Sequence, residues 1–357
     1  VRVLDAWGLL DGLKALAAFP EQLRVRDVRS GALLGALALG FDARQRYGQP
    51  YATVHRADLH GLLLNAVRHH EGVRLHLNQR VASFAQGSVG VQVVDECGAQ
   101  LEGAALLGCD GLWSRVRTQL LGAHPVRSSG HLAYRGMVRS TDLPSALRAP
   151  LVTAWLGPRL HAVHYPVRGG DWFNLVVVVQ GVIGQGHGGA VDSDPQSWTH
   201  EAHATDLRRT LGEVDKDLLA MVDAVGAWKL WPLNDRPPMA GAHEHAQGRV
   251  ALLGDAAHPL RPYLAQGAAM ALEDAWTLGE LVGQAQGRVD DWPGLLQRMA
   301  GTRWQRNARV QARSARNGTI FHAQGALRGA RNLAMWVMGE HLLDNPWLYE
   351  GPPAPVA

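Results

Sequence analysis

One short block most constrains the fold of this chain: an apolar strand, a polar turn and a helix follow each other directly. Residues 250 to 253 form the apolar run, the sequence GDAAHP occupies residues 254 to 259, and a helical pattern begins near Gly267. A carboxylate at a strand end can accept hydrogen bonds from sugar-like hydroxyls, and unpaired N–H groups at a helix start favour negative charge. The block therefore predicts a cofactor-binding element of an α/β fold.

This block allows two other interpretations. Asp255 could merely cap the turn and His258 could be an ordinary loop histidine, but their joint placement favours the cofactor interpretation. A metal site at Asp255 and His258 needs a third ligand, and the segment supplies no clear one. We therefore expect no bound metal.

Length and composition set the class of protein. With 357 residues, 46% of them hydrophobic and 19% charged, the chain fits two packed globular domains. The net charge of +3 implies no general surface for polyanions, and Cys97 and Cys109 are too few for a disulfide framework. Apolar runs are far shorter than the roughly 20 residues of a membrane helix, and no signal peptide opens the chain. We expect a cytoplasmic protein with no membrane partner.

The hydrophobic periodicity gives a coarse map of the elements. It predicts an opening helix through Leu13, short strands over 21 to 54, and an amphipathic helix over 59 to 67. It also predicts strands from 73 to a buried run at 104 to 107, a second sheet with strands at 151 to 156, 161 to 167 and 173 to 179, and helices from 292 to 345. The Pro-rich stretch 231 to 238 looks like a crossover, and residues 352 to 355 look like a frayed tail. Leu272, Ala275, Trp276 and Leu281 can share one face of the helix that begins at Gly267.

Two further sequence blocks lie upstream of residue 250, and their order along the chain is informative. His55-Arg56-Ala57-Asp58-Leu59 opens the first amphipathic helix, and the sequence GCDGLWSRVR at 108 to 117 follows a predicted strand. Together with residues 254 to 274, these blocks resemble the flavin-contacting motifs of class A flavoprotein monooxygenases, the salicylate hydroxylase and hydroxybenzoate hydroxylase family. Taken singly, Arg56 could be a solvated residue and Asp110-Gly111 a simple turn.

The resemblance implies a fold and a domain organisation. The fold is α/β, with an FAD-binding Rossmann-like domain of the glutathione-reductase type interleaved with a β-sheet substrate domain and a C-terminal helical region. The FAD-binding domain is expected at 1–20, 51–126 and 232–290, the substrate domain at 21–50 and 127–231, and the C-terminal helices and tail at 291–357.

The resemblance also implies an activity: NADH or NADPH reduces bound FAD, O2 adds to form a flavin hydroperoxide, and one oxygen atom is transferred to a small phenolic or hydroxybenzoate-like substrate. Such reactions serve the breakdown of aromatic compounds. A homodimer is left open, and no nucleic-acid partner is expected. The cofactor-binding residues implied by the resemblance are Arg56, Asp110, Gly111, Gly254, Asp255, Pro259, Gln266, Gly267 and Ala268.

The chain departs from the family at its start. Family members open with a strand, a G-x-G-x-x-G turn and a helix, whereas this chain begins at Val1, so we expect that an upstream segment is missing. Its G-x-G-x-x-G at Gly184, Gly186 and Gly189 lacks an apolar helix behind it, so we interpret it as a flexible loop. A non-hydroxylating flavoprotein reductase of the same fold and an inactive fragment remain as alternatives.

The second sheet contains the candidate catalytic residues. If the strand is extended, His161, Val163 and Tyr165 lie on one face and His164 on the other. The resemblance implies that His161 takes the phenolic proton of the substrate and Tyr165 orients the ring, although a satisfied core histidine is nearly as good an interpretation.

A row of arginines follows in the C-terminal part. Arg303, Arg306, Arg309, Arg313 and Arg316 could form one basic helix stripe, which we interpret as solvated or salt-bridged because no aromatic platform for nucleic acid accompanies it.

Overall fold

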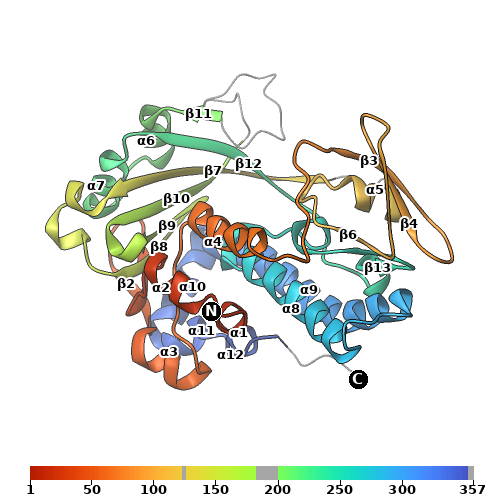
Figure 1. Cartoon of the computed structure of the whole chain (residues 1–357). Coiled ribbons are helices and arrows are strands. Elements are labelled where there is room, and N and C mark those ends of the chain that lie inside the picture. Colours follow the sequence, from red (N-terminus) through yellow and green to blue (C-terminus); the bar gives the residue numbers. More distant parts are fainter. Residues whose placement is uncertain (123–125, 182–199, 353–357) are drawn as a thin grey trace. The chain divides into compact units, whose positions relative to one another are not determined.

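The computed structural model describes residues 1–122, 126–181 and 200–352, in two compact units (Figure 1). The first, here called the sheet unit, comprises Val1–Val73, Ser129–Leu233 and Thr319–Glu350. The second, here called the turn unit because it contains residues 254 to 259, comprises Arg74–Ser128 and Asn234–Gly318, with the chain from Gly351. The loop with Gly184, Gly186 and Gly189 and most of the predicted tail lie outside the described residues.

An eight-stranded sheet, in the order β11-β12-β7-β10-β9-β8-β1-β2, forms the centre of the sheet unit. Its strands are β1 (Gln22–Asp27), β2 (Leu33–Ala38), β7 (Arg127–Arg139), β8 (Leu151–Gly157), β9 (Leu160–Val167), β10 (Trp172–Gln180), β11 (His200–Ala202) and β12 (Trp228–Asp235). The three strands predicted between 151 and 179 are confirmed as an antiparallel run. The predicted crossover near 231 is wrong in part, because β12 belongs to the sheet despite Pro232.

The two faces of strand β9 contact different apolar clusters. Ala162 belongs to the large core between the sheet and the helices α6 (Ala204–Leu211) and α7 (Lys216–Ala224). The ring of His164 lies edge-on to Trp155 and Phe173 of this core. Val163 and Tyr165 pack instead with Leu37 and Val152 in a separate cluster. The strand alternation predicted from the sequence is therefore present.

Helices complete the sheet unit. They are α1 (Arg2–Ala6), α2 (Leu10–Leu16), α3 (Gly40–Tyr47), α4 (Arg56–Arg68), α10 (Gly325–Met338), α11 (Glu340–Leu343) and α12 (Pro346–Tyr349). The single opening helix predicted through Leu13 is wrong, because Gly8 adopts a φ of 72° and divides it in two. The strands expected up to residue 54 also end early, since Gly40 to Tyr47 form a helix.

The turn unit contains two small sheets. One joins β6 (Leu106–Gly108), β13 (Ala246–Gln247) and β14 (Val250–Leu252), with β14 parallel to β6; the other joins β3 (Val81–Gln86), β4 (Val91–Asp95) and β5 (Gln100–Gly103). Strand β14 is wholly buried, as predicted. The run at 104 to 107 is not, because Leu107 is 39% exposed.

Three helices belong wholly or largely to the turn unit: α5 (Arg115–Leu121), α8 (Gly267–Gln284) and α9 (Trp292–Phe321), which continues into the sheet unit. The predicted common face of α8 is wrong: Leu281 is buried, whereas Leu272, Ala275 and Trp276 are only partly buried. The buried face of α8 carries both apolar and polar side chains: Met270, Glu273, Asp274, Thr277, Leu278 and Leu281. The spacing of apolar residues does not identify this face, because two of its residues, Glu273 and Asp274, are carboxylates.

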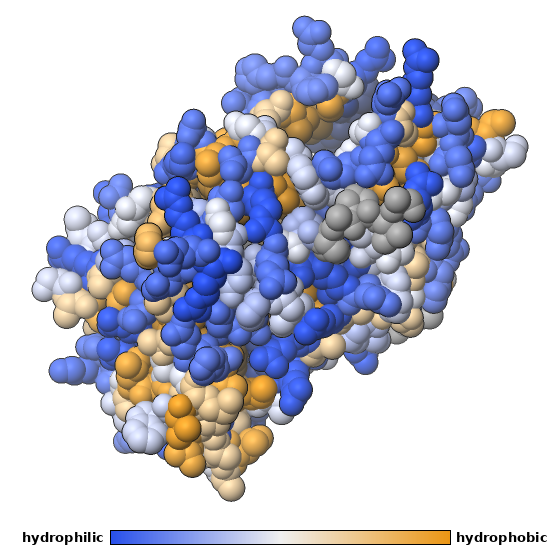
Figure 2. All heavy atoms as spheres, turned by 90° about the horizontal axis from the view of Figure 1, so that it is seen from below, coloured by the Kyte–Doolittle hydropathy of each residue, from blue (hydrophilic) through white to orange (hydrophobic). Residues whose placement is uncertain are grey.

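The surface is mostly hydrophilic on the face drawn in Figure 2, with hydrophobic residues gathered in separate groups. Among the described residues, no helix combines the length and the apolar character that a membrane crossing requires. Cys97 and Cys109 are both free thiols.

Candidate functional site

The turn after β14 exposes a single carboxylate. From Val250 to Pro259 every residue is buried except Asp255. Gly254 begins the turn with a φ of 57°, and an added Cβ would lie 3.1 Å from Cβ of Ala271, so a side chain here would be strained. Burial of the neighbours and the glycine turn together place the Asp255 carboxylate at the surface.

The start of α8 lies close to this carboxylate. A Cβ added to Gly267 would lie 3.9 Å from Oδ1 of Asp255. The N-cap residue Gln266 makes no side-chain capping hydrogen bond, and the first turn of the helix has no acidic residue. Small residues, Gly267 and Ala268, line this turn, so its N–H groups are accessible to a ligand with partial negative charge. A ligand that carries hydroxyl groups next to electron-rich groups would fit the Asp255 carboxylate and this helix start together.

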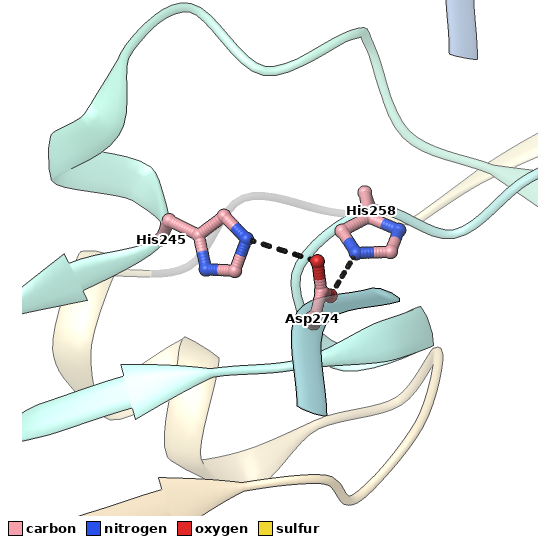
Figure 3. A group of neighbouring side chains, drawn as sticks. All are labelled: His245, His258 and Asp274. Atoms are coloured by element: carbon pink, nitrogen blue, oxygen red, sulfur yellow. Dashed lines mark hydrogen bonds and ion pairs between the residues drawn. The ribbon is translucent and has the colours of Figure 1, made fainter. Parts of the chain in front are cut away.

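Asp274 of α8 ties the turn to the helix (Figure 3). Its carboxylate lies between His245 and His258, with Nε2 of His258 2.5 Å from Oδ2 and Nε2 of His245 3.7 Å from Oδ1. The backbone N–H of Gly254 also donates to Oδ2, at 3.1 Å. The turn is thus held from the helix by a buried carboxylate, and His258 pairs with Asp274 rather than with Asp255.

Arginines of α9 complete this network. Arg303, which is fully buried, donates from Nε to Oδ1 of Asp274 at 2.9 Å and from Nη1 to Oε2 of Glu273 at 2.7 Å. Asn307 donates to the same Oδ1 at 3.1 Å, and Arg306 forms a second ion pair with Glu273. The salt-bridged interpretation of the arginine row is confirmed for Arg303 and Arg306.

The chemistry of the His245, His258 and Asp274 group is that of an ion network. Their potential ligand atoms lie within 4.8 Å of one another, which metal binding would also require. However, each oxygen of Asp274 already accepts two hydrogen bonds, and a guanidinium lies 2.9 Å away. Burial opposes ionisation of Asp274, yet the charges and hydrogen bonds of His258 and His245 hold its pKa well below the usual range.

The other predicted cofactor residues lie at two helix starts. Asp110 follows β6 and accepts hydrogen bonds from Ser114 Oγ at 2.5 Å and from the N–H groups of Arg115 and Val116 at 2.8 and 3.1 Å, so it caps α5. Gly111 has a φ of 77°, which suits a glycine. In the sheet unit, Arg56 is exposed at the first position of α4.

His161 and Tyr165 lie on the same face of β9 with Val163 between them. Their backbone positions are about 13 Å apart along the strand, at a rise of roughly 3.3 Å per residue. His161 is 3% exposed, and Nδ1 of its ring lies 2.8 Å from Nε2 of His322. Burial, together with the nearby His322 and His131, holds the pKa of His161 well below its usual range, so the ring is neutral. Burial raises the pKa of Tyr165, which keeps its hydroxyl protonated.

Sequence reasoning missed several of these residues: His245, Asp274, Arg303, Asn307 and His322. Asp274 lies in the quoted motif without an assigned role, and Arg303 lies in the arginine row. The available signal was an acidic pair at 273 and 274 facing a predicted basic helix. His245 and His322 carry no pattern of their own in the sequence.

Comparisons with known proteins identify the family of this chain. Residues 1–292 match the family model described as an FAD binding domain. The 3-hydroxybenzoate 6-hydroxylase of Polaromonas naphthalenivorans is 35% identical over 331 residues, which cover 92% of this chain and 78% of that protein. The 3-amino-4-hydroxybenzoate 2-monooxygenase PtnB3 of Streptomyces platensis is 33% identical over 99% of this chain and 85% of its own length.

Solved structures share the fold. Klebsiella pneumoniae HpxO complexed with FAD and uric acid aligns with a TM-score of 0.82 at 23% identity, covering 98% of this chain and 86% of that one. A salicylate hydroxylase substrate complex aligns with a TM-score of 0.79 at 22% identity, covering 99% of this chain and 89% of that one. The fold class expected from the sequence is thus confirmed. The chain belongs to the FAD-binding-domain family, among the class A FAD-dependent monooxygenases that hydroxylate aromatic compounds, and FAD is its cofactor.

Proposed function

We propose that this protein hydroxylates a small aromatic substrate bearing a phenolic hydroxyl, of the hydroxybenzoate or salicylate kind, with NADH or NADPH as electron donor and O2 as co-substrate. The observation that carries the proposal is a buried neutral imidazole, His161, on a strand face that also carries the protonated phenol of Tyr165. A neutral imidazole suits the acceptance of a phenolic proton. The hydroxybenzoate hydroxylases among the relatives support the same class of substrate.

Residues of the turn unit have roles suited to FAD. The Asp255 carboxylate would accept hydrogen bonds from the ribityl hydroxyls, and the N–H groups of Gln266 to Ala268 would favour negative charge on the ring. Gly254 permits the turn, and the buried Pro259 would restrict the backbone beside it. FAD held by these residues would supply the redox chemistry, namely acceptance of a hydride and activation of O2.

The cofactor contacts predicted for Asp110 and Arg56 rest on different observations. Asp110 uses its carboxylate to cap α5, so its part would be to shape the loop at Gly111, whose backbone would approach the pyrophosphate. Arg56 stays a predicted cofactor contact. Its neighbour Asp58 is held by a bidentate pair with Arg168, at 2.7 and 2.9 Å, which fixes the start of α4.

Oxygen insertion tests the proposed function. The full-length protein with FAD, NADH or NADPH, and 3-hydroxybenzoate or salicylate under ¹⁸O2 should give a product that carries one ¹⁸O atom. Nicotinamide oxidation that never yields an oxygenated product, with either substrate, would favour the reductase instead. Bound FAD with no nicotinamide oxidation at all would favour an inactive protein.

A cytoplasmic location stays a prediction, and a homodimer stays open. Light scattering decides the oligomeric state: a mass twice that of one chain would support a homodimer, and a monomeric mass at all concentrations would exclude it. Fractionation of the source cells tests the cytoplasmic location.

A further inference from the structure

A second histidine contacts the proposed proton acceptor of the sheet unit. His322 follows α9 and is 4% exposed. Its Nε2 lies 2.8 Å from Nδ1 of His161, and the two ring centroids are 5.0 Å apart. Because Nδ1 of His161 is engaged with His322, proton exchange between His161 and a substrate would use Nε2.

Backbone contacts fix the position of His322. The carbonyl of His322 accepts a hydrogen bond from the N–H of Arg159, just before β9, at 3.2 Å. The last carbonyls of α9, those of Ile320 and Phe321, accept from the buried guanidinium of Arg331 on α10 at 3.2 and 2.8 Å. A helix end normally leaves such carbonyls without a partner within the helix. Here they anchor the segment that presents His322 to β9.

The surroundings keep both rings neutral. Burial, with His131 and Arg331 nearby, lowers the pKa of His322 to about 3. The ring of His131 on β7 lies edge-on to His322, with centroids 4.8 Å apart. In a neutral pair one nitrogen donates and the other accepts. A lone imidazole in this environment would be a poor proton acceptor, and a neutral ring nitrogen that accepts the hydrogen bond from Nδ1–H stabilises the positive charge that His161 gains.

We propose that His322 is a positioning residue for His161: it selects the tautomer of His161 that carries its proton on Nδ1, which leaves Nε2 to accept the proton of the substrate. This inference rests on the proposed function, in which His161 accepts the phenolic proton. In the step, the phenolic O–H bond breaks and its proton binds to Nε2 of His161. The proton on Nδ1 of His161 stays in the 2.8 Å hydrogen bond to Nε2 of His322. His161 ends as the imidazolium, His322 stays neutral, and the substrate ends as the phenolate.

Two variants of His322 test the role in the full-length protein loaded with FAD. His322→Leu removes the partner nitrogen, and His322→Gln keeps a polar group that can hydrogen bond with Nδ1 of His161. With 3-hydroxybenzoate as the probe, we expect His322→Leu to lower kcat roughly tenfold at pH 7, within the range of general-base effects. The loss should shrink as pH rises, because a substrate that is already a phenolate needs no base. His322→Gln should recover part of the rate.

The outcomes separate this inference from the proposed function. Loss of rate by the same factor at every pH, or a wild-type pH profile in both variants, would overturn the role of His322. His161→Ala is measured in parallel. If this variant keeps full activity, the proton acceptor itself is misassigned. A defect confined to His161 variants leaves the proposed function intact and rejects only the role of His322.

A measurement without turnover covers the case in which His322→Leu fails to fold. Long-range ¹H–¹⁵N spectra of the wild-type protein with ¹⁵N-labelled histidine, assigned with His161→Gln, report which ring nitrogen carries the proton. We expect the Nδ1–H tautomer for His161 in the absence of substrate. The Nε2–H tautomer would overturn the proposal.

Discussion

Asp274 is a buried carboxylate with both oxygens fully used, two hydrogen bonds to each, and it joins the turn at Gly254 to the arginines of α9. Asp274→Asn keeps the shape but leaves Arg303 with less negative charge inside the protein. Breaking one partner of a buried pair typically costs about 3–5 kcal/mol, so we expect a clear drop in the urea midpoint of unfolding. The same substitution at the exposed Asp290 should change stability by less than about 0.5 kcal/mol. Equal midpoints for both variants would contradict the network's role.

His322 gives a pH dependence of stability with a definite sign. Its pKa is about 3 in the folded protein and ordinary, near 6.5, in the unfolded chain. The unfolded chain therefore binds more protons between these values, and the free energy of unfolding falls as pH drops below about 6.5. Urea unfolding at several pH values between 5 and 7 should show a shallower slope in His322→Gln than in the wild type, by up to about 1.4 kcal/mol per pH unit for one proton. A slope that does not change would mean that His322 is not buried as a neutral ring.

At the scale of elements, the strand, turn and helix around residue 255 are the part that depends most on one backbone conformation. Gly254→Ala places a side chain at a positive φ and 3.1 Å from Ala271, so both stability and bound FAD should decrease. Gly279→Ala, on the exposed side of the same helix with nothing within 4 Å, should instead stabilise by about 0.5–1 kcal/mol. Thermal melting and the flavin-to-protein absorbance ratio measure both. Opposite signs are the expected result, and a Gly254→Ala variant as stable as the wild type would contradict it.

The same element shows what sequence patterns can and cannot predict. Strand β14, the turn and the start of α8 follow from apolar runs and helix-start chemistry, and the alternation of His161, His164 and Tyr165 follows from the period of a strand. The buried face of α8 does not, because hydrophobic spacing treats Glu273 and Asp274 as surface residues and cannot foresee their pairing with Arg303. The contact of His161 with His322 is equally hidden, since it joins residues 161 positions apart in the chain.

At the scale of the whole molecule, three separated blocks of sequence are assigned to one cofactor and one class of substrate. The family is established by the comparisons, while the roles of individual residues are proposals that depend on FAD being held where the turn unit exposes Asp255. The most direct test is a titration of the full-length apoprotein with FAD, followed by flavin absorbance and fluorescence, for the wild type, Asp255→Ala and Asp290→Ala. The account predicts a stoichiometric complex for the wild type and Asp290→Ala, and an affinity at least roughly tenfold weaker for Asp255→Ala, as expected for the loss of hydrogen bonds to a charged group. Unchanged FAD affinity in Asp255→Ala would contradict it.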